Sequence, residues 1–372
     1  MFNKQILDIE KQISSQTSKK FGLLEGYGGV SLFYFYLGRL TKNTTYHDRG
    51  MELLSECIEK LDARNGSYCN GMSGIGQLLN LLVEEDFVEI PAELFDYLDN
   101  QIKKWTLTEL ERNNLDLLYG ATGSLLYLCQ RSKTKPELKS FLEKSLCTVD
   151  SIAVKSGDKA FWRNWDFENK CLNTESYDLG IAHGQISIIY LLSKLYSTTQ
   201  ISIGPELIES SLRSLQFASS NKKTGEYYFP YFYDPLNPSK FSKSRLGWCY
   251  GDLATSVILG RIVKKHGLLE YEEWISKISK NTSHLTKQDA ANESSLCHGF
   301  AGCALLFSKL AQKFPNSGLD KIAEDYKIRT SSSLVYDNID LLDGLSGVAL
   351  FLMSGNGEKF VKWQHLLLID DE

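Results

Sequence analysis

Short, almost wholly apolar segments alternate along this chain with longer segments in which apolar residues recur at helical spacing. The segment at 51–61 shows the spaced pattern, with apolar residues at positions 51, 54, 58 and 61, and a similar pattern runs from Leu94 through Leu98 and Ile102 to Trp105. This spacing places the apolar side chains on one face of a helix. Similar segments begin near residues 4, 137, 206, 269 and 319, so seven amphipathic outer helices are predicted.

A glycine motif precedes each short apolar segment and recurs seven times. Its copies read EGYGG, NGMSG, YGATG, HGQIS, YGDLA, HGFAG and DGLSG, and their first glycines are Gly26, Gly71, Gly120, Gly184, Gly251, Gly299 and Gly344. Ser187 and Ala254 replace the second glycine in the fourth and fifth copies. The segments that follow, such as VSLFYFYL and CALLFSKL, are apolar on nearly all sides, which predicts seven buried inner helices.

The repeats predict one closed helical domain. A helical hairpin whose inner helix is apolar all round cannot cover that helix alone, so the copies must pack side by side. The last copy, DGLSGVALFLM, is as apolar as the others, whereas an open solenoid needs polar terminal repeats. We therefore predict an all-α fold, an α/α toroid (double α-barrel) of seven helical hairpins that occupies residues 1–372 as a single domain.

Two insertions interrupt the repeat. Successive first glycines are 45, 49, 64, 67, 48 and 45 residues apart, and the two long intervals place extra residues near 156–182 and 220–248. Both fall just before a glycine motif, so we expect them on the rim where the inner helices begin, and insertions on one face of a repeat protein mark its binding face. They contain FWRNWDF and EYYFPYFYDP, which would line a peptide site or form a satellite core. The second is expected to form a hairpin.

Charge and composition exclude several classes of protein. A net charge of -5 and a pI near 5.8 give no reason to expect a nucleic-acid or anionic-membrane partner. The N-terminus lacks an apolar signal core and no segment is long enough to span a bilayer, so we expect a cytoplasmic protein that reaches a membrane only through a biosynthetic complex. The 8 cysteines are widely scattered and form no CxxC pair, so neither a disulfide framework nor a zinc ribbon is indicated.

The cysteines fall into different environments. Cys57, Cys129 and Cys147 lie in helical apolar patterns and are predicted to be in the core, whereas Cys171 lies in a polar loop and receives no role. Cys69 stands two residues before the first glycine of its copy and is interpreted as packing.

In two neighbouring repeats, residues of types that bind metals occupy the two positions before the first glycine. Cys249 and Cys297 stand two before it, and His298 stands one before it. Adjacent residues of a helix do not face one another, but irregular backbone before the glycine lets Cys297 and His298 reach one ion. Two cysteines and one histidine leave the fourth tetrahedral position open, as in catalytic zinc sites. The alternative is two buried thiols beside an ordinary loop histidine, since the 48-residue separation matches no local zinc motif.

Four further polar or aromatic residues lie near the same motifs. His183 in DLGIAHGQ is an acid–base candidate, or else a core histidine bonded to a backbone carbonyl. Asp116 in NLDLLYG would approach the same site or cap a helix. Arg245 and Trp248 precede Cys249 in SRLGWCYGD, where the arginine could pair with a surface acid and the tryptophan could pack in the core.

Taken together, SLCHGFAG, GWCYGD with Arg245 upstream, DLGIAHGQ and the seven glycine motifs resemble the lanthionine synthetase C-like (LanC-type) cyclases over about residues 20–355. The resemblance implies an α/α toroid that holds one Zn²⁺ ion through Cys249, Cys297 and His298. It also implies His183 as the acid–base residue, surrounded by Asp116, Arg245, Trp248 and Tyr250. Ser187 and Asp252 depart from the usual pattern of the family, at positions that concern the shape of the pocket and not the metal ligands.

The activity that the resemblance implies is that of a lanthionine synthetase. Such an enzyme adds peptide cysteine thiolates to dehydroalanine or dehydrobutyrine and forms (methyl)lanthionine thioether rings in a ribosomally synthesised peptide. The chain carries no fused dehydratase, so the class I arrangement is expected, with a dehydrated precursor peptide, a separate dehydratase and an exporter as partners. Two alternatives stay open: a LanC-like protein that binds or adds a small thiol such as glutathione, and a non-catalytic peptide-binding toroid.

Overall fold

The computed structural model describes residues 2–173, 175–220, 222–237, 244–286, 291, 293–332 and 337–370, and it is mostly helical. Every predicted outer helix is present among these residues, and each buries one stripe of its surface. They are α1 (Phe2–Ser14), α3 (Thr44–Glu59), α5 (Ala92–Glu111), α7 (Leu138–Ser151), α9 (Ile203–Ser219), α11 (Glu272–Leu285) and α13 (Leu319–Ser332).

The seven predicted inner helices are also present in the described residues, and each begins directly after the first glycine of its motif. They are α2 (Tyr27–Thr41), α4 (Met72–Glu84), α6 (Ala121–Arg131), α8 (Gln185–Thr199), α10 (Asp252–His266), α12 (Phe300–Lys313) and α14 (Leu345–Met353). Almost every residue of these helices is buried, as an apolar surface on all sides requires. The prediction of seven helical hairpins is therefore confirmed.

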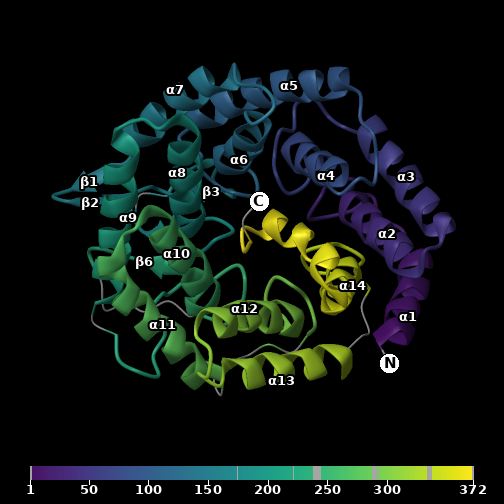
Figure 1. The fold of residues 1–372 in the computed structure, drawn as a ribbon. Helices are drawn as coiled ribbons and strands as arrows, with labels where there is room; N and C mark the ends of the chain where they lie inside the picture. The colour runs from purple at the N-terminus through teal and green to yellow at the C-terminus, as the bar shows by residue number, and fades with distance from the viewer. Residues whose placement is uncertain are drawn as a thin grey trace. The chain divides into compact units, whose positions relative to one another are not determined.

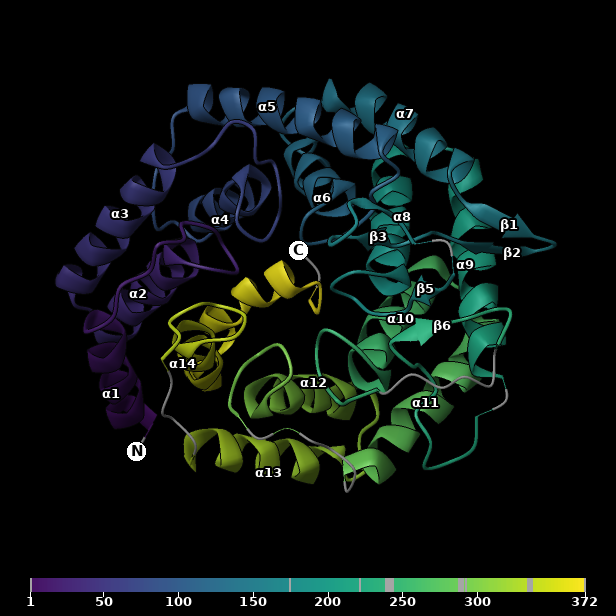
Figure 2. The same ribbon diagram turned by 180° about the vertical axis from the view of Figure 1, so that it is seen from behind.

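The chain divides into two compact units. The first comprises Met1–Ile102, Ala291–Ala311 and Gly318–Glu372, and the second comprises Lys103–Ala290 and Gln312–Ser317. In the first unit α2 packs against α3, α4 and α14, and α14 also contacts α1, so the last hairpin meets the first (Figure 1). In the second unit α8 packs against α6, α7, α9 and α10, and α10 packs against α11 (Figure 2). The expectation of a single domain stays a prediction.

Backbone hydrogen bonds join the loops that precede consecutive inner helices. In the first unit the N–H of Cys297 donates to Leu342 O at 3.0 Å, that of Leu342 to Leu24 O at 3.2 Å, and that of Leu24 to Cys69 O at 3.0 Å. All four residues stand two before the first glycine of their motifs. The repeat thus places equivalent residues of neighbouring hairpins side by side, and it links the seventh hairpin to the first.

The second glycine of the motif has a steric cause. A Cβ atom added at Gly347 would lie 1.9 Å from Leu341 O, and one added at Gly302 would lie 2.0 Å from Leu296 O. In both cases the carbonyl belongs to the residue six earlier, because the preceding loop folds back over the first turn of the inner helix. A side chain at either of these two glycines would displace the loop before the helix, whereas the fourth and fifth repeats accommodate Ser187 and Ala254 at the equivalent position.

The insertions contain the strands that the structure describes, all short. β1 (Val154–Ser156) pairs with β2 (Lys159–Phe161), and β3 (Trp165–Asp166) pairs with β4 (Cys171–Leu172), in each case antiparallel. β5 (Tyr177–Asp178) pairs with β6 (Phe232–Tyr233) of the second insertion. In the described part of the second insertion, the expected hairpin is thus replaced by a strand that pairs with the first insertion. Residues 221 and 238–243 of the second insertion lie outside the described residues.

One cysteine prediction is wrong. Cys57 and Cys129 are buried as expected, but Cys147 is exposed. In α7 the buried stripe runs through Leu142, Leu146 and Val149, and Cys147 follows Leu146 by one residue. One residue is about 100° of rotation around a helix, so its side chain leaves the buried face.

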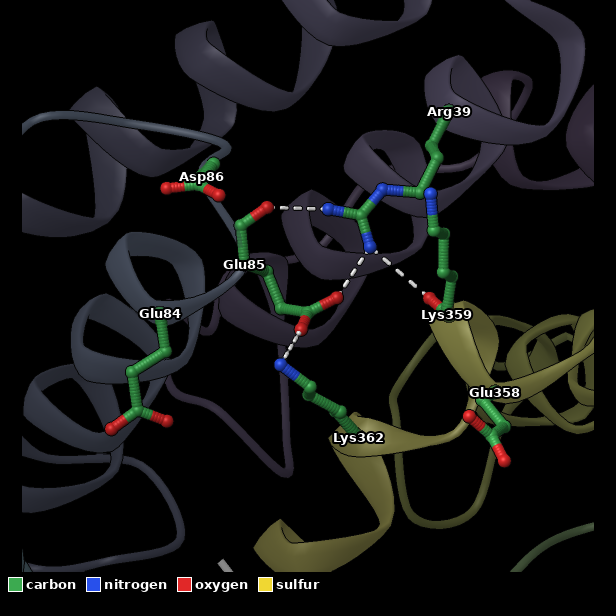
Figure 3. A pocket seen from close by; sticks show the side chains of 7 residues that line it. All are labelled: Arg39, Glu84, Glu85, Asp86, Glu358, Lys359 and Lys362. Atoms are coloured by element: carbon green, nitrogen blue, oxygen red, sulfur yellow. Dashed lines mark hydrogen bonds and ion pairs between the residues drawn. The ribbon is translucent and has the colours of Figure 1, made fainter.

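Past α14 the chain continues in three 3₁₀ helices, η3 (Ser354–Asn356), η4 (Glu358–Phe360) and η5 (Lys362–Leu367), and η5 packs against α4. A cavity of about 530 Å³ lies where this segment meets the ends of α2 and α4 (Figure 3). Its lining is charged and comprises Arg39, Glu84, Glu85, Asp86, Glu358, Lys359 and Lys362. None of the predicted site residues lines it. Among the helices of the described residues, none has the length and apolar character that a membrane crossing requires.

Candidate metal centre and acid–base residues

The three predicted zinc ligands lie together. The sulfur atoms of Cys249 and Cys297 and a ring nitrogen of His298 all lie within 4.8 Å of one another. Both cysteines are buried, and the histidine side chain is 36% exposed, so the group has a dry side and an open side. Two thiols and one imidazole are a donor set that suits Zn²⁺, whose tetrahedral ligands lie about 3.5–4 Å apart. The residues present therefore fit the ion after small side-chain movements.

Two carboxylates flank the imidazole of His298. Its Nε2 lies 2.8 Å from Glu293 Oε1, and its Nδ1 lies 3.7 Å from Asp343 Oδ1. The first distance is that of a hydrogen bond and the second is too long for one. Glu293 was not among the residues that the sequence singled out.

His183 and Asp116 form the second predicted cluster. Nδ1 of His183 donates to Asp116 Oδ2 at 2.6 Å, and the other oxygen of that carboxylate accepts the backbone N–H of Tyr119 at 2.8 Å. Asp116 does not cap a helix, because the N-cap of α6 is Gly120 and Tyr119 lies before it. The carboxylate instead holds the loop before α6 with one oxygen and His183 with the other. Since Nδ1 is held by Asp116, Nε2 is the nitrogen of His183 that remains for proton transfer.

The electrostatic surroundings keep His183 protonated. Burial by itself lowers the pKa of the imidazole, but the adjacent Asp116 carboxylate acts in the opposite direction through its charge and its hydrogen bond, with a smaller contribution from Asp178. The net effect raises the pKa of His183 from 6.5 to about 9. A histidine with this pKa can donate a proton at neutral pH.

Two aromatic rings border the imidazole. Tyr119 lies parallel to His183 with the ring centroids 6.5 Å apart, and Phe167 meets it edge-on at 5.8 Å. Phe167 comes from the first insertion, between β3 and β4, and is 43% exposed. Other aromatic residues of that insertion, such as Phe161 and Trp162, are buried. The insertion therefore supplies both a satellite core and an aromatic side chain at the acid–base residue.

Tyr250 is tied to a buried carboxylate. Its hydroxyl donates to Asp178 Oδ2 at 2.8 Å, and Asp178 Oδ1 accepts the backbone N–H of Gly180 at 2.7 Å. Burial raises the pKa of Asp178 to about 6, although both hydrogen bonds act in the other direction. Burial and the neighbouring Asp178 likewise raise the pKa of Tyr250.

The remaining predicted site residues lie in the same loop as Cys249. Arg245 is half-buried, and its Nε donates to the hydroxyl of Tyr231 at 2.6 Å. Trp248 is 1% exposed and belongs to the core, as one of its two interpretations requires. Asp252, which departs from the family pattern, is fully buried and accepts the N–H groups of Tyr228 and Phe229 at 3.0 Å each. It therefore anchors the second insertion to the start of α10.

Sequence reasoning missed Asp178, Glu293 and Phe167. Asp178 and Glu293 stand six residues before the first glycines Gly184 and Gly299, a position that the alignment of repeats could have reached had it been extended. For Phe167 the only signal was the aromatic composition of the first insertion, which does not distinguish one ring from its neighbours.

Comparison with known proteins supports the same fold. None of the curated proteins matches the chain. A solved structure of nisin cyclase matches it with a TM-score of 0.73 and 18% sequence identity, over 99% of this chain and 96% of that one. The likeness gives the chain the α/α toroid fold that the repeats predict. The sequence profile of lanthionine synthetase C-like proteins matches residues 17–368. With nearly its whole length covered by that profile, the chain belongs to the lanthionine synthetase C-like family.

Proposed function

We propose that this protein is a zinc-dependent lanthipeptide cyclase, which closes thioether rings in a dehydrated precursor peptide. The observation that carries the proposal is the cluster of Cys249, Cys297 and His298, whose ligand atoms lie within 4.8 Å of one another in the loops before the inner helices. The family and the likeness to nisin cyclase support a peptide substrate.

The proposed reaction adds a cysteine thiol of the peptide across the double bond of a dehydroalanine or dehydrobutyrine. Sulfur bonds to the β-carbon, and a proton is delivered to the α-carbon. Cys249, Cys297 and His298 would hold the zinc ion, which when bound favours the thiolate form of a thiol that otherwise has a pKa of about 8.5.

His183 is the residue we assign to protonation of the α-carbon. Its Nε2–H would donate the proton, because Nδ1 is engaged by Asp116 and the raised pKa keeps the ring charged at neutral pH. Asp116 would orient the ring, and its own position is fixed by the N–H of Tyr119. Arg245 would stabilise the negative charge that develops on the enolate oxygen.

The insertions would bind the peptide. Phe167 of the first insertion and Phe232 and Leu236 of the second are all exposed apolar side chains. Such side chains suit an extended, largely apolar peptide, and the net charge of -5 suits a basic one. A separate dehydratase would supply the dehydrated substrate, since the reaction consumes its double bonds.

The metal is tested by zinc analysis of purified protein. We expect one zinc ion per chain, and its loss in Cys297→Ala, which removes one of three ligands. Cys69→Ala is the matched control, because Cys69 is buried and stands at the equivalent position two before its glycine. Zinc-free wild-type protein, or equal zinc in Cys297→Ala, would contradict the proposal.

The reaction is tested on a dehydrated precursor peptide. After incubation, free thiols are alkylated and counted by mass spectrometry; the wild type should leave none, and zinc removal by a chelator should leave all of them. Conversion of the peptide only when glutathione is added would instead identify a small-thiol transferase. Bound peptide whose thiols all remain free, with and without glutathione, would identify a binding protein.

A further inference from the structure

The position six residues before the first glycine has a fixed backbone role. In five of the seven repeats its carbonyl accepts the N–H of the first residue of the inner helix, at 2.8–3.1 Å. The donor and acceptor pairs are Tyr27 and Lys20, Met72 and Asn65, Ala121 and Asn114, Phe300 and Glu293, and Leu345 and Asn338. The side chain at this position is therefore presented from the same place in each of these loops.

Three of these five side chains are asparagines with a purely local use. Oδ1 of Asn65, Asn114 and Asn338 accepts the N–H of the residue two further on, at 3.2, 3.2 and 2.8 Å. An asparagine side chain that bonds its own backbone in this way stabilises a turn. The ordinary function of the position is thus to shape the loop.

Glu293 departs from that use in the repeat that carries two of the three metal-site residues. Its Oε1 lies 2.8 Å from Nε2 of His298, and it also accepts the hydroxyl of Ser295 at 3.0 Å. Ser295 is fully buried, so one contact of the carboxylate is with a side chain that has little freedom to move. The position whose side chain shapes the loop in other repeats therefore places a carboxylate beside His298, a predicted zinc ligand, in this one.

We infer that Glu293 is a positioning residue that fixes the ring orientation and tautomer of His298. With Nε2–H donated to Glu293, the lone pair of the imidazole is on Nδ1, which becomes the nitrogen that binds the metal. In metal sites the hydrogen bond at one ring nitrogen selects the other nitrogen as ligand, and it also makes the ligand more basic. The inference rests on the proposed zinc site, and it adds which nitrogen binds and what holds it.

The competing interpretation is an ordinary surface ion pair. Both side chains are about one-third exposed, and such pairs contribute only about 0–1 kcal/mol to stability. A surface pair would leave zinc affinity unchanged when Glu293 is replaced, whereas loss of a positioning carboxylate costs about 10–100-fold in metal affinity. Zinc affinity therefore separates the two interpretations independently of catalysis.

The experiment compares the zinc dissociation constants of Glu293→Ala, Glu293→Gln and the wild type by competition with a chromogenic chelator. We expect Glu293→Ala to bind zinc about 10–100-fold more weakly, and Glu293→Gln to lie closer to the wild type, because its amide oxygen still accepts Nε2–H. Asn65→Ala is the matched control, since it removes the side chain at the same backbone position of a repeat that carries no ligand and whose loop bonds Leu24 instead of a ligand residue. It should bind zinc within about twofold of the wild type whatever its stability.

A second measurement reads the tautomer without metal or substrate. The chain has 6 histidines, so ¹⁵N-labelled histidine with long-range ¹H–¹⁵N correlation resolves each ring, recorded in metal-free protein at a pH where the ring of His298 is neutral. We expect the Nε2–H form in the wild type and a mixture in Glu293→Ala. Unchanged zinc affinity or an unchanged tautomer in Glu293→Ala would overturn the inference. If the wild type bound no zinc, the proposed function would fail, and the tautomer would still decide the role of Glu293.

Discussion

At the scale of single residues, the pair of Asp116 and His183 predicts how the rate of cyclisation depends on pH. Because burial opposes the charge on His183, its pKa of about 9 depends on the carboxylate. The proton that it donates is present below that pH and is lost as the pH rises through it. We expect kcat/KM for cyclisation to fall above pH 9 in the wild type.

Asp116→Asn should move that alkaline limb to lower pH. Without the carboxylate, burial opposes only the smaller contributions of Asp178 and Cys249, and we expect the pKa of His183 to return close to its ordinary value of 6.5. At pH 8 the protonated fraction would then be about 30-fold lower than in the wild type, and kcat/KM should fall by about the same factor. The measurement is a pH–rate profile from pH 6 to 10.

Asp340→Asn is the matched control for this profile. Asp340 also stands four residues before the first glycine of its motif, but its Oδ1 accepts the N–H of Gly26 and not a histidine. The alkaline limb of the pH–rate profile of Asp340→Asn should coincide with that of the wild type. If Asp116→Asn kept the wild-type limb as well, His183 would not be the group that titrates there.

The sequence identifies residues that share a repeat position, but it does not identify their individual hydrogen bonds. His183 and the three zinc-ligand candidates could be found because they stand one or two residues before a repeated glycine. The bond between Asp116 and His183 joins residues 67 positions apart and depends on side-chain rotamers that no spacing encodes. Asp178 and Glu293 stand six residues before their glycines, outside the two positions that the repeat comparison covered.

At the scale of elements, the second glycine of the motif controls how tightly the loop folds over the inner helix. Gly347→Ala would bring a Cβ atom to 1.9 Å from Leu341 O, a backbone atom that cannot swing aside as a side chain could. We expect the free energy of unfolding to fall by about 1–3 kcal/mol, as for overpacked cores. Chemical denaturation of the metal-free protein measures it, so that zinc binding does not contribute.

Gly355→Ala serves as the comparison for Gly347→Ala. Gly355 lies in η3, and a Cβ atom there would meet nothing within 4 Å. Its unfolding free energy should stay within about 0.5 kcal/mol of the wild type. If both variants unfolded alike, the close approach of the loop would not be the reason for the glycine.

Helices were predictable because their signal is periodic and repeated, whereas strands in the insertions were not. All fourteen predicted helices are present in the described residues, since each is specified by an apolar stripe or an apolar segment after a glycine. β5 and β6 pair residues 177–178 with 232–233, and two-residue strands carry no alternation that a sequence can reveal. Their pairing follows from the fold, which brings the two insertions together.

At the scale of the whole chain, its first and last hairpins meet within the first unit. The α14 helix packs against α1 and α2, and the bond from Leu342 N to Leu24 O joins the seventh hairpin to the first. The segment beyond α14 is held by a charged network. The buried Glu85 carboxylate bonds Arg39 and Lys362, the latter at 2.6 Å, and Arg39 also donates to Lys359 O at 3.1 Å (Figure 3).

Glu85→Ala tests whether this network secures the C-terminal segment. Glu85 is 5% exposed and Arg39 22%, so removing the carboxylate leaves a largely buried guanidinium without its counter-charge. Breaking a buried pair in this way costs about 3–5 kcal/mol, and we expect a loss near 3 kcal/mol because Arg39 keeps some solvent and lies over the ring of Phe87. The free energy of unfolding in denaturant and the tryptic cleavage rate after Lys359 and Lys362 are the measurements. The exposed Glu84, which lines the same cavity, provides the control: Glu84→Ala should change stability by no more than about 0.5 kcal/mol. Equal stability and equal cleavage in the two variants would show that apolar packing of η5 against α4, and not Glu85, holds the end of the chain in place.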